Sequence, residues 1–172
     1  MIVASASIHQ TENLIISISY YLPTTTSFLN IPYISPINSA IMDVKHDIRN
    51  IEDIKELVNN FYKQIQQDEL LGPIFSQVIQ NRWDIHLEKM YRFWQTILLN
   101  EYTYFGSPFL PHAHLPIDEE HFVHWLGLFY STVDRMFIGE KANEAKWRAE
   151  KMATMFAHKI AHIQQGNSKP LL

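Results

Sequence analysis

Two histidines, His112 and His114, stand in a stretch that is too rich in proline for a long helix, EYTYFGSPFLPHAHLPIDEEH. The stretch also carries aromatic side chains and leucines. A neutral imidazole on an irregular loop that faces an apolar pocket is one way in which a protein holds the iron of a haem. The H-x-H pair is therefore a candidate source of one axial ligand.

Three further polar side chains, Tyr62, His86 and Trp125, lie on or beside apolar helical stripes in three different segments. Each has an ordinary structural explanation, such as a core tyrosine with its hydroxyl at the surface or a core histidine bonded to a backbone carbonyl. Placed opposite one loop histidine, the same three groups would supply hydrogen-bond donors near the sixth coordination position of an iron.

Two other histidine pairs have helical spacing, His121 with His124 and His158 with His162. Each pair could face one way and bind zinc, but a closed zinc site needs four ligands. Both pairs lie largely off the apolar stripes, which indicates a solvated helix face. A metal hydrolase based on histidine also lacks a three-ligand set with a nearby base.

Apolar residues recur every three or four positions in four segments, which indicates four substantial helices. We expect these helices at about residues 51–65, 82–100, 118–139 and 142–165. Gly72 and Pro73 predict a break after the first helix, with Phe75 plugging the corner, and Gly139 predicts the end of the third. Burying such wide stripes requires one helix pair to pack over the other.

Composition bounds the class of protein. The chain has 172 residues, of which 47% are hydrophobic, and this is enough for one domain with a real core. The net charge of −4 argues against a nucleic-acid partner. The absence of cysteine excludes disulfides and cysteine-based metal sites, and it is compatible with a reducing cytoplasm, where we expect the protein.

Residues 1–41 differ from the rest, because Glu12 is their only charged side chain. They have neither the basic start of a signal peptide nor an apolar run long enough for a membrane span. We expect a flexible or spurious N-terminal extension at 1–41, a globular domain at 42–166 and a frayed tail at 167–172.

The segments NNFYKQI, LGPIF, RWDIHLEKMYRFW, PHAHLPI and HFVHWLGLF occur in order between residues 42 and 165. Together they resemble the truncated haemoglobins of the third group, which are bacterial proteins. The resemblance implies an all-α, globin-like two-over-two helical sandwich that encloses a b-type haem.

Residue roles carried over from this family start with His112 as the proximal iron ligand, because only His112 begins the H-x-x-L-P pattern that continues through Leu115. Tyr62, His86 and Trp125 match the distal positions, and His86 could gate access or bind the iron itself. The apolar haem contacts implied by the resemblance are Phe75, Met90, Phe93, Trp94 and Leu115. Position 124 departs from the family, because relatives often carry a basic or apolar residue where this chain has His124.

The function implied is binding of dioxygen, and of NO or CO, at a ferrous haem iron. The physiological task could be oxygen supply, or NO or peroxide chemistry of the NO dioxygenase or peroxidase kind, which requires a reductase not yet identified. Lys89 and Arg92 are candidates to pair with the haem propionates. We expect a monomer with no membrane partner. The alternative is a haem-free globin-like sensor or interaction domain.

Overall fold

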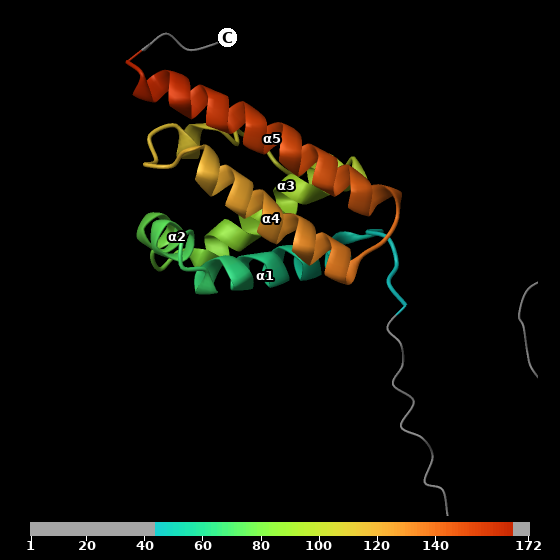
Figure 1. The fold of residues 1–172 in the computed structure, drawn as a ribbon. Coiled ribbons are helices and arrows are strands. Elements are labelled where there is room, and N and C mark those ends of the chain that lie inside the picture. The colour runs from blue at the N-terminus through green and yellow to red at the C-terminus, as the bar shows by residue number, and fades with distance from the viewer. Residues whose placement is uncertain (1–43, 167–172) are drawn as a thin grey trace, which may run out of the picture. The chain divides into compact units, whose positions relative to one another are not determined.

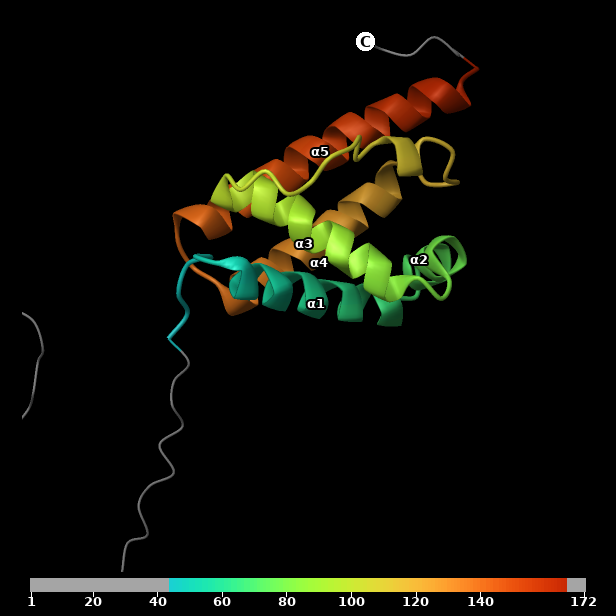
Figure 2. The same cartoon turned by 180° about the vertical axis from the view of Figure 1, so that it is seen from behind.

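The computed structural model describes residues 44–166, and this part of the chain folds into helices joined by short connections. The helices are α1 (Ile51–Gln67), α2 (Gly72–Ile79), α3 (Trp83–Leu99), α4 (Glu119–Met136) and α5 (Glu140–Gln164). A single 3₁₀ turn, η1 (Leu110–His112), interrupts the long connection between α3 and α4. Within the described range α1 packs on α3 and α4 packs on α5, and α1 also packs on α4 (Figures 1 and 2). The predicted two-over-two sandwich is confirmed.

Helix starts follow from side chains that satisfy free backbone N–H groups. The side chain of Asn50 accepts hydrogen bonds from the backbone N–H groups of Glu52 and Asp53, and Asp53 bonds back to complete a capping box. Asp118 does the same for α4, with its carboxylate accepting from the backbone N–H of His121. Both starts place acidic residues in the first turn, where the helix dipole favours negative charge.

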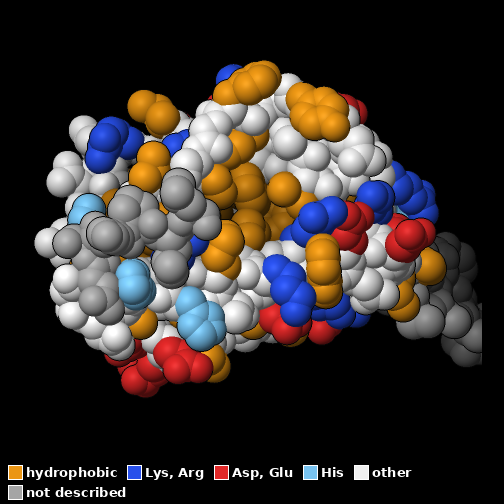
Figure 3. All heavy atoms as spheres, turned by 90° about the horizontal axis from the view of Figure 1, so that it is seen from above, with side chains coloured by type: hydrophobic (Ala, Val, Ile, Leu, Met, Phe, Trp, Pro, Cys, Tyr) orange, Lys and Arg blue, Asp and Glu red, His pale blue; other side chains and the backbone are white. Residues whose placement is uncertain are grey.

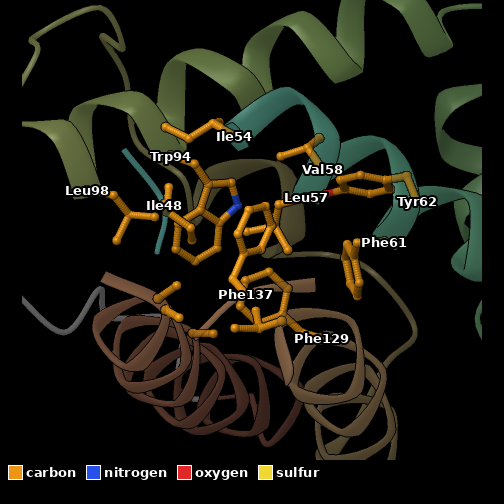
Figure 4. Close-up of a cluster of buried hydrophobic side chains, with 14 of the residues drawn as sticks. Ile48, Ile54, Leu57, Val58, Phe61, Tyr62, Trp94, Leu98, Phe129 and Phe137 are labelled. Carbon is orange, nitrogen blue, oxygen red and sulfur yellow. The ribbon is translucent and has the colours of Figure 1, made fainter. Parts of the chain in front are cut away.

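The core lies where α1, α3 and α4 meet, and the start of α5 closes it with alanines (Figure 4). Phe129 of α4 lies between two indole rings, with ring centroids 5.0 Å from Trp94 and 5.5 Å from Trp125. Both pairs are stacked, and Phe61 of α1 meets Phe129 edge-on at 5.2 Å. These aromatic contacts fix the relative positions of three helices.

A break follows the first helix as expected, since α1 ends at Gln67, but the break lies at residues 68–71, and Gly72 and Pro73 begin the additional helix α2. Proline suits the first turn of a helix, since the backbone N–H that it lacks has no partner there. A Cβ atom on Gly72 would lie 3.2 Å from the backbone carbonyl oxygens of Ile65 and Gln66, so only glycine fits easily against the end of α1. The same two residues therefore turn the chain and restart the helix.

Gly139 does not end the third predicted helix, since α4 stops at Met136 and Gly139 is the N-cap of α5. Its φ of 144° suits glycine. The carboxylate of Asp47 accepts hydrogen bonds from the backbone N–H groups of Lys141 at 2.9 Å and Ala142 at 2.8 Å. A Cβ on Gly139 would collide with that carboxylate. The start of the domain thus caps its last helix.

None of the helices in residues 44–166 combines the length and the apolar character that crossing a membrane requires. The predicted extension at 1–41 and the predicted tail at 167–172 lie outside the described residues, so these two domain assignments stay predictions.

Candidate functional site

A cavity of about 200 Å³ opens between the helices and the loop that carries η1. All nine side chains that the sequence analysis proposed as the proximal ligand, distal groups or apolar haem contacts line it. They are Tyr62, Phe75, His86, Met90, Phe93, Trp94, His112, Leu115 and Trp125. On the face of the molecule seen from above, hydrophobic side chains gather in a hollow with charged side chains beside it (Figure 3).

His112 closes η1, and its ring is held from two sides. Its Nδ1 lies 2.8 Å from the backbone carbonyl oxygen of Pro108, and its ring centroid lies 5.1 Å from that of Phe156 on α5. Because a carbonyl can only accept, Nδ1 carries the proton and Nε2 of the neutral ring keeps its lone pair. Nε2 is therefore the atom through which this imidazole could bind an iron.

Burial lowers the pKa of His112, and the positive charge of Lys89 lowers it further, although the bond to Pro108 acts in the opposite direction. The ring is therefore neutral at pH 7, as a metal ligand must be. His114 is exposed and is not part of the cavity wall. Of the two histidines in the H-x-H pair, only His112 lines the cavity.

Tyr62, His86 and Trp125 come to the cavity from α1, α3 and α4, respectively. The rings of Tyr62 and His86 meet edge-on with centroids 4.8 Å apart, and Trp125 meets Phe61 edge-on at 5.4 Å. Tyr62 is only 6% exposed. Helix packing therefore fixes three polar groups around one space.

His86 Nε2 is buried without a hydrogen-bond partner among the described residues. Burial is the main reason why the pKa of His86 falls to about 4, with smaller contributions from His112 and Lys89. Burial also raises the pKa of the Tyr62 phenol far above its ordinary value. At pH 7 the cavity thus holds a neutral imidazole and a neutral phenol, and the imidazole has an unmet hydrogen-bonding need.

The sequence analysis missed several residues of the wall. Tyr104 lies on the loop before η1 and meets Phe93 edge-on at 5.3 Å, and Phe156 and Met152 reach the cavity from α5. His121, which we expected on a solvated face, lines the cavity, and His124 is bonded to Asp68. Only the apolar spacing of α5 pointed to any of these contacts.

The two predicted propionate partners differ in position. Lys89 lines the cavity, whereas Arg92 does not and is paired with Glu88 at 2.9 Å on the helix surface. Lys89 is therefore the better candidate for an anionic group at the edge of a cofactor.

The donor set suits a metal that arrives inside an organic cofactor. Among residues 44–166 no three histidine or acidic side chains are grouped closely enough to hold a bare metal ion. The cavity instead offers one imidazole lone pair, a mostly apolar wall and an unpartnered imidazole nitrogen. A haem fits these residues, because it needs one axial ligand and a large apolar surround.

Comparisons with known proteins agree with this reading. Residues 46–162 match the family described as bacterial-like globin. The chain is 33% identical over 121 residues to a group 3 truncated haemoglobin of Campylobacter jejuni, an alignment that covers 68% of this chain and 95% of the relative. The crystal structure of a group III truncated haemoglobin from Campylobacter jejuni superposes with a TM-score of 0.63, at 33% identity, over 67% of this chain and 94% of the other.

Proposed function

This chain belongs to the bacterial-like globin family, among the truncated haemoglobins of the third group, and we propose that this haem-binding globin takes dioxygen, as well as NO and CO, at a ferrous b-type haem. The observation that supports the proposal most is the cavity itself. Two imidazoles line it. His112 is neutral, and its Nδ1 is already bonded to the carbonyl oxygen of Pro108. His86 has an Nε2 that lacks a hydrogen-bond partner among the described residues.

His112 would hold the haem through Nε2. The hydrogen bond to Pro108 fixes the tautomer and the direction of the ring, and the contact with Phe156 limits its rotation. A bound haem would supply an iron centre that can bind a diatomic ligand.

The distal groups would offer hydrogen-bond donors to a ligand in the cavity. Tyr62 would donate through its hydroxyl and Trp125 through its indole N–H, and both are neutral donors in a space with a mostly apolar lining. A donor in such surroundings stabilises negative charge more strongly than it would in water. His86 either adds a donor or regulates access to this space.

Several hydrogen-bond donors around one ligand would slow its release. This favours a task in which the bound ligand reacts, rather than oxygen delivery. Slow release suits NO or peroxide chemistry, because a delivery protein must give its ligand up. Such chemistry would require a supply of electrons, for which a reductase is the expected partner.

An absorption spectrum of the purified full-length protein tests the proposal. We expect a Soret band in the oxidised protein that shifts when the protein is reduced under carbon monoxide. A colourless protein that also fails to take up added haemin contradicts the proposal and favours the haem-free sensor or interaction domain.

A further inference from the structure

Asp68 sits at the corner between α1 and α2. Its Oδ1 accepts hydrogen bonds from the backbone N–H groups of Leu70 at 3.0 Å and Leu71 at 2.9 Å. Its Oδ2 accepts one from Nε2 of His124 on α4, at 2.6 Å. One carboxylate therefore fixes the backbone of the corner and also ties it to a helix 56 residues further along the chain.

Helix α2 forms one wall of the cavity through Phe75 and Ile79, and Leu71 precedes it on the same wall. In the described part of the chain α2 packs chiefly on α1, and it has no comparable packing on α3, α4 or α5. Helix α2 also lies at one end of the helical sandwich (Figure 1). A short helix with few supports is the kind of element that opens locally at low cost.

The bond between Asp68 and His124 supplies a second support for this wall. Within residues 44–166 no other ion pair joins the corner between α1 and α2 to α4. His124 directly precedes Trp125, which lines the cavity. The bond thus connects the backbone that leads to Phe75 with the helix turn that carries Trp125.

The character of the bond favours a lasting contact. The side chain of Asp68 is 14% exposed, and that of His124 is 42% exposed. Burial raises the pKa of Asp68, but the hydrogen bonds from His124, Leu71 and Leu70 outweigh this effect and hold the pKa below its ordinary value. Asp68 is therefore ionised at neutral pH, and a hydrogen bond that it accepts is charge-assisted.

We propose that Asp68 and His124 are positioning residues that hold the α2 wall, with Phe75, against α4, with Trp125, and thereby control how readily the distal side of the cavity opens. The part of this inference that concerns ligands rests on the proposed haem function. The part that concerns the opening of α2 does not.

The bond between Asp68 and His124 would act as a clamp on α2. Hydrogen–deuterium exchange on the full-length, haem-loaded protein tests this clamp. In His124→Ala we expect exchange in residues 72–79 to accelerate about fivefold, the factor that corresponds to losing about 1 kcal/mol. Exchange in residues 54–61 of α1 should not change. The control is Lys146→Ala, which removes a 2.5 Å ion pair with Asp134 between α4 and α5 and should leave residues 72–79 unaffected.

A conservative variant separates positioning from general stability. His124→Gln keeps a side chain that can donate to Asp68, so we expect it to restore slow exchange in residues 72–79 at least partly. In the carbon monoxide complex, His124→Ala should shift or broaden the C–O stretching band, which senses nearby donors, and His124→Gln should return it toward the original frequency.

Unchanged exchange of α2 in His124→Ala and in Asp68→Asn overturns the clamp, and so does equal acceleration in every helix. If the protein takes up no haem, the proposed function fails, but the exchange experiment on the same chain still decides whether the clamp exists. If α2 opens faster while the C–O band stays fixed, the link to the distal donors is wrong.

Discussion

The two sides of the cavity are built in different ways. On the distal side Tyr62, His86 and Trp125 come from three helices, and their rings interlock with a shared aromatic core. On the other side His112 lies in a three-residue turn, and its partner Pro108 is only four residues away. The proposed function therefore makes ligand control depend on how several helices pack, whereas it makes attachment of the haem depend mainly on a short piece of chain.

The largest effect on haem binding should come from the side of the cavity that carries His112. In His112→Ala we expect loss of haem retention, because no other described histidine in the loop lines the cavity. The measurement is the ratio of Soret to protein absorbance after desalting. His114→Ala is the matched control and should keep its haem. The reverse result would move the ligand to His114 and break the comparison.

The distal side, whose rings pack into the aromatic core, should contribute more to the free energy of unfolding than the loop does. Phe129 is 1% exposed and lies between two indoles, so Phe129→Ala should lower the free energy of unfolding by about 3–5 kcal/mol. Leu110→Ala, in the loop turn, should cost less than about 0.5 kcal/mol, because Leu110 is 70% exposed. Urea unfolding of both variants in the same state of haem loading checks this. Similar losses would show that the loop is as much a part of the core as α4.

Acid should act mainly through the distal histidine. The folded-state pKa of His86 is about 4, below its ordinary value of 6.5, so the unfolded chain binds the extra proton first as the pH falls. Stability from this group is therefore complete above about pH 6.5 and is lost between pH 6.5 and 4. The loss should be on the order of 1–3 kcal/mol.

Urea unfolding of the haem-free protein at pH 7 and pH 4.5 measures this loss. His86→Gln should remove more of the acid sensitivity than His112→Gln, since the bond to Pro108 counteracts the pKa shift of His112. Equal acid sensitivity of the unmodified protein and of His86→Gln would contradict this assignment.

The smallest effect should be on ligand release. Tyr62→Phe and Trp125→Phe each remove one donor, and we expect dioxygen to dissociate about three to ten times faster, which corresponds to one net hydrogen bond. Stopped-flow displacement by carbon monoxide gives the rate. Tyr91→Phe is a suitable control, because that hydroxyl bonds to Asn59 outside the cavity. If neither distal variant differs from the control, the proposed roles of these donors are wrong.

Helical periodicity was enough to predict the long helices and their inward faces. It also predicted the inward position of Tyr62, His86 and Trp125, because each lies on an apolar stripe that must be buried, and all three line the cavity. Asp118 and the acidic first turns were also readable, since helix starts depend on neighbouring residues alone.

Some of the features that the sequence analysis missed depend on contacts between residues far apart in the chain. Others depend on residues that are compatible with two different local structures. Gly72 and Pro73 suit both a break and a helix start, and only the close approach of α1 decides between them. Tyr104 reaches the cavity because its loop folds back over α3, and His124 finds its partner across 56 residues. No local pattern contains that information.

The cap that Asp47 places on α5 affects the order in which a newly made chain can fold. The carboxylate and the N–H group of Lys141 are 94 residues apart, so a ribosome needs roughly 5–20 s to make the intervening chain. During that interval α1 and α3 exist without α5, and their apolar faces lack one of their covers. The cap on α5 can form only when the last helix emerges, and until then the growing chain exposes apolar surface that chaperones can bind.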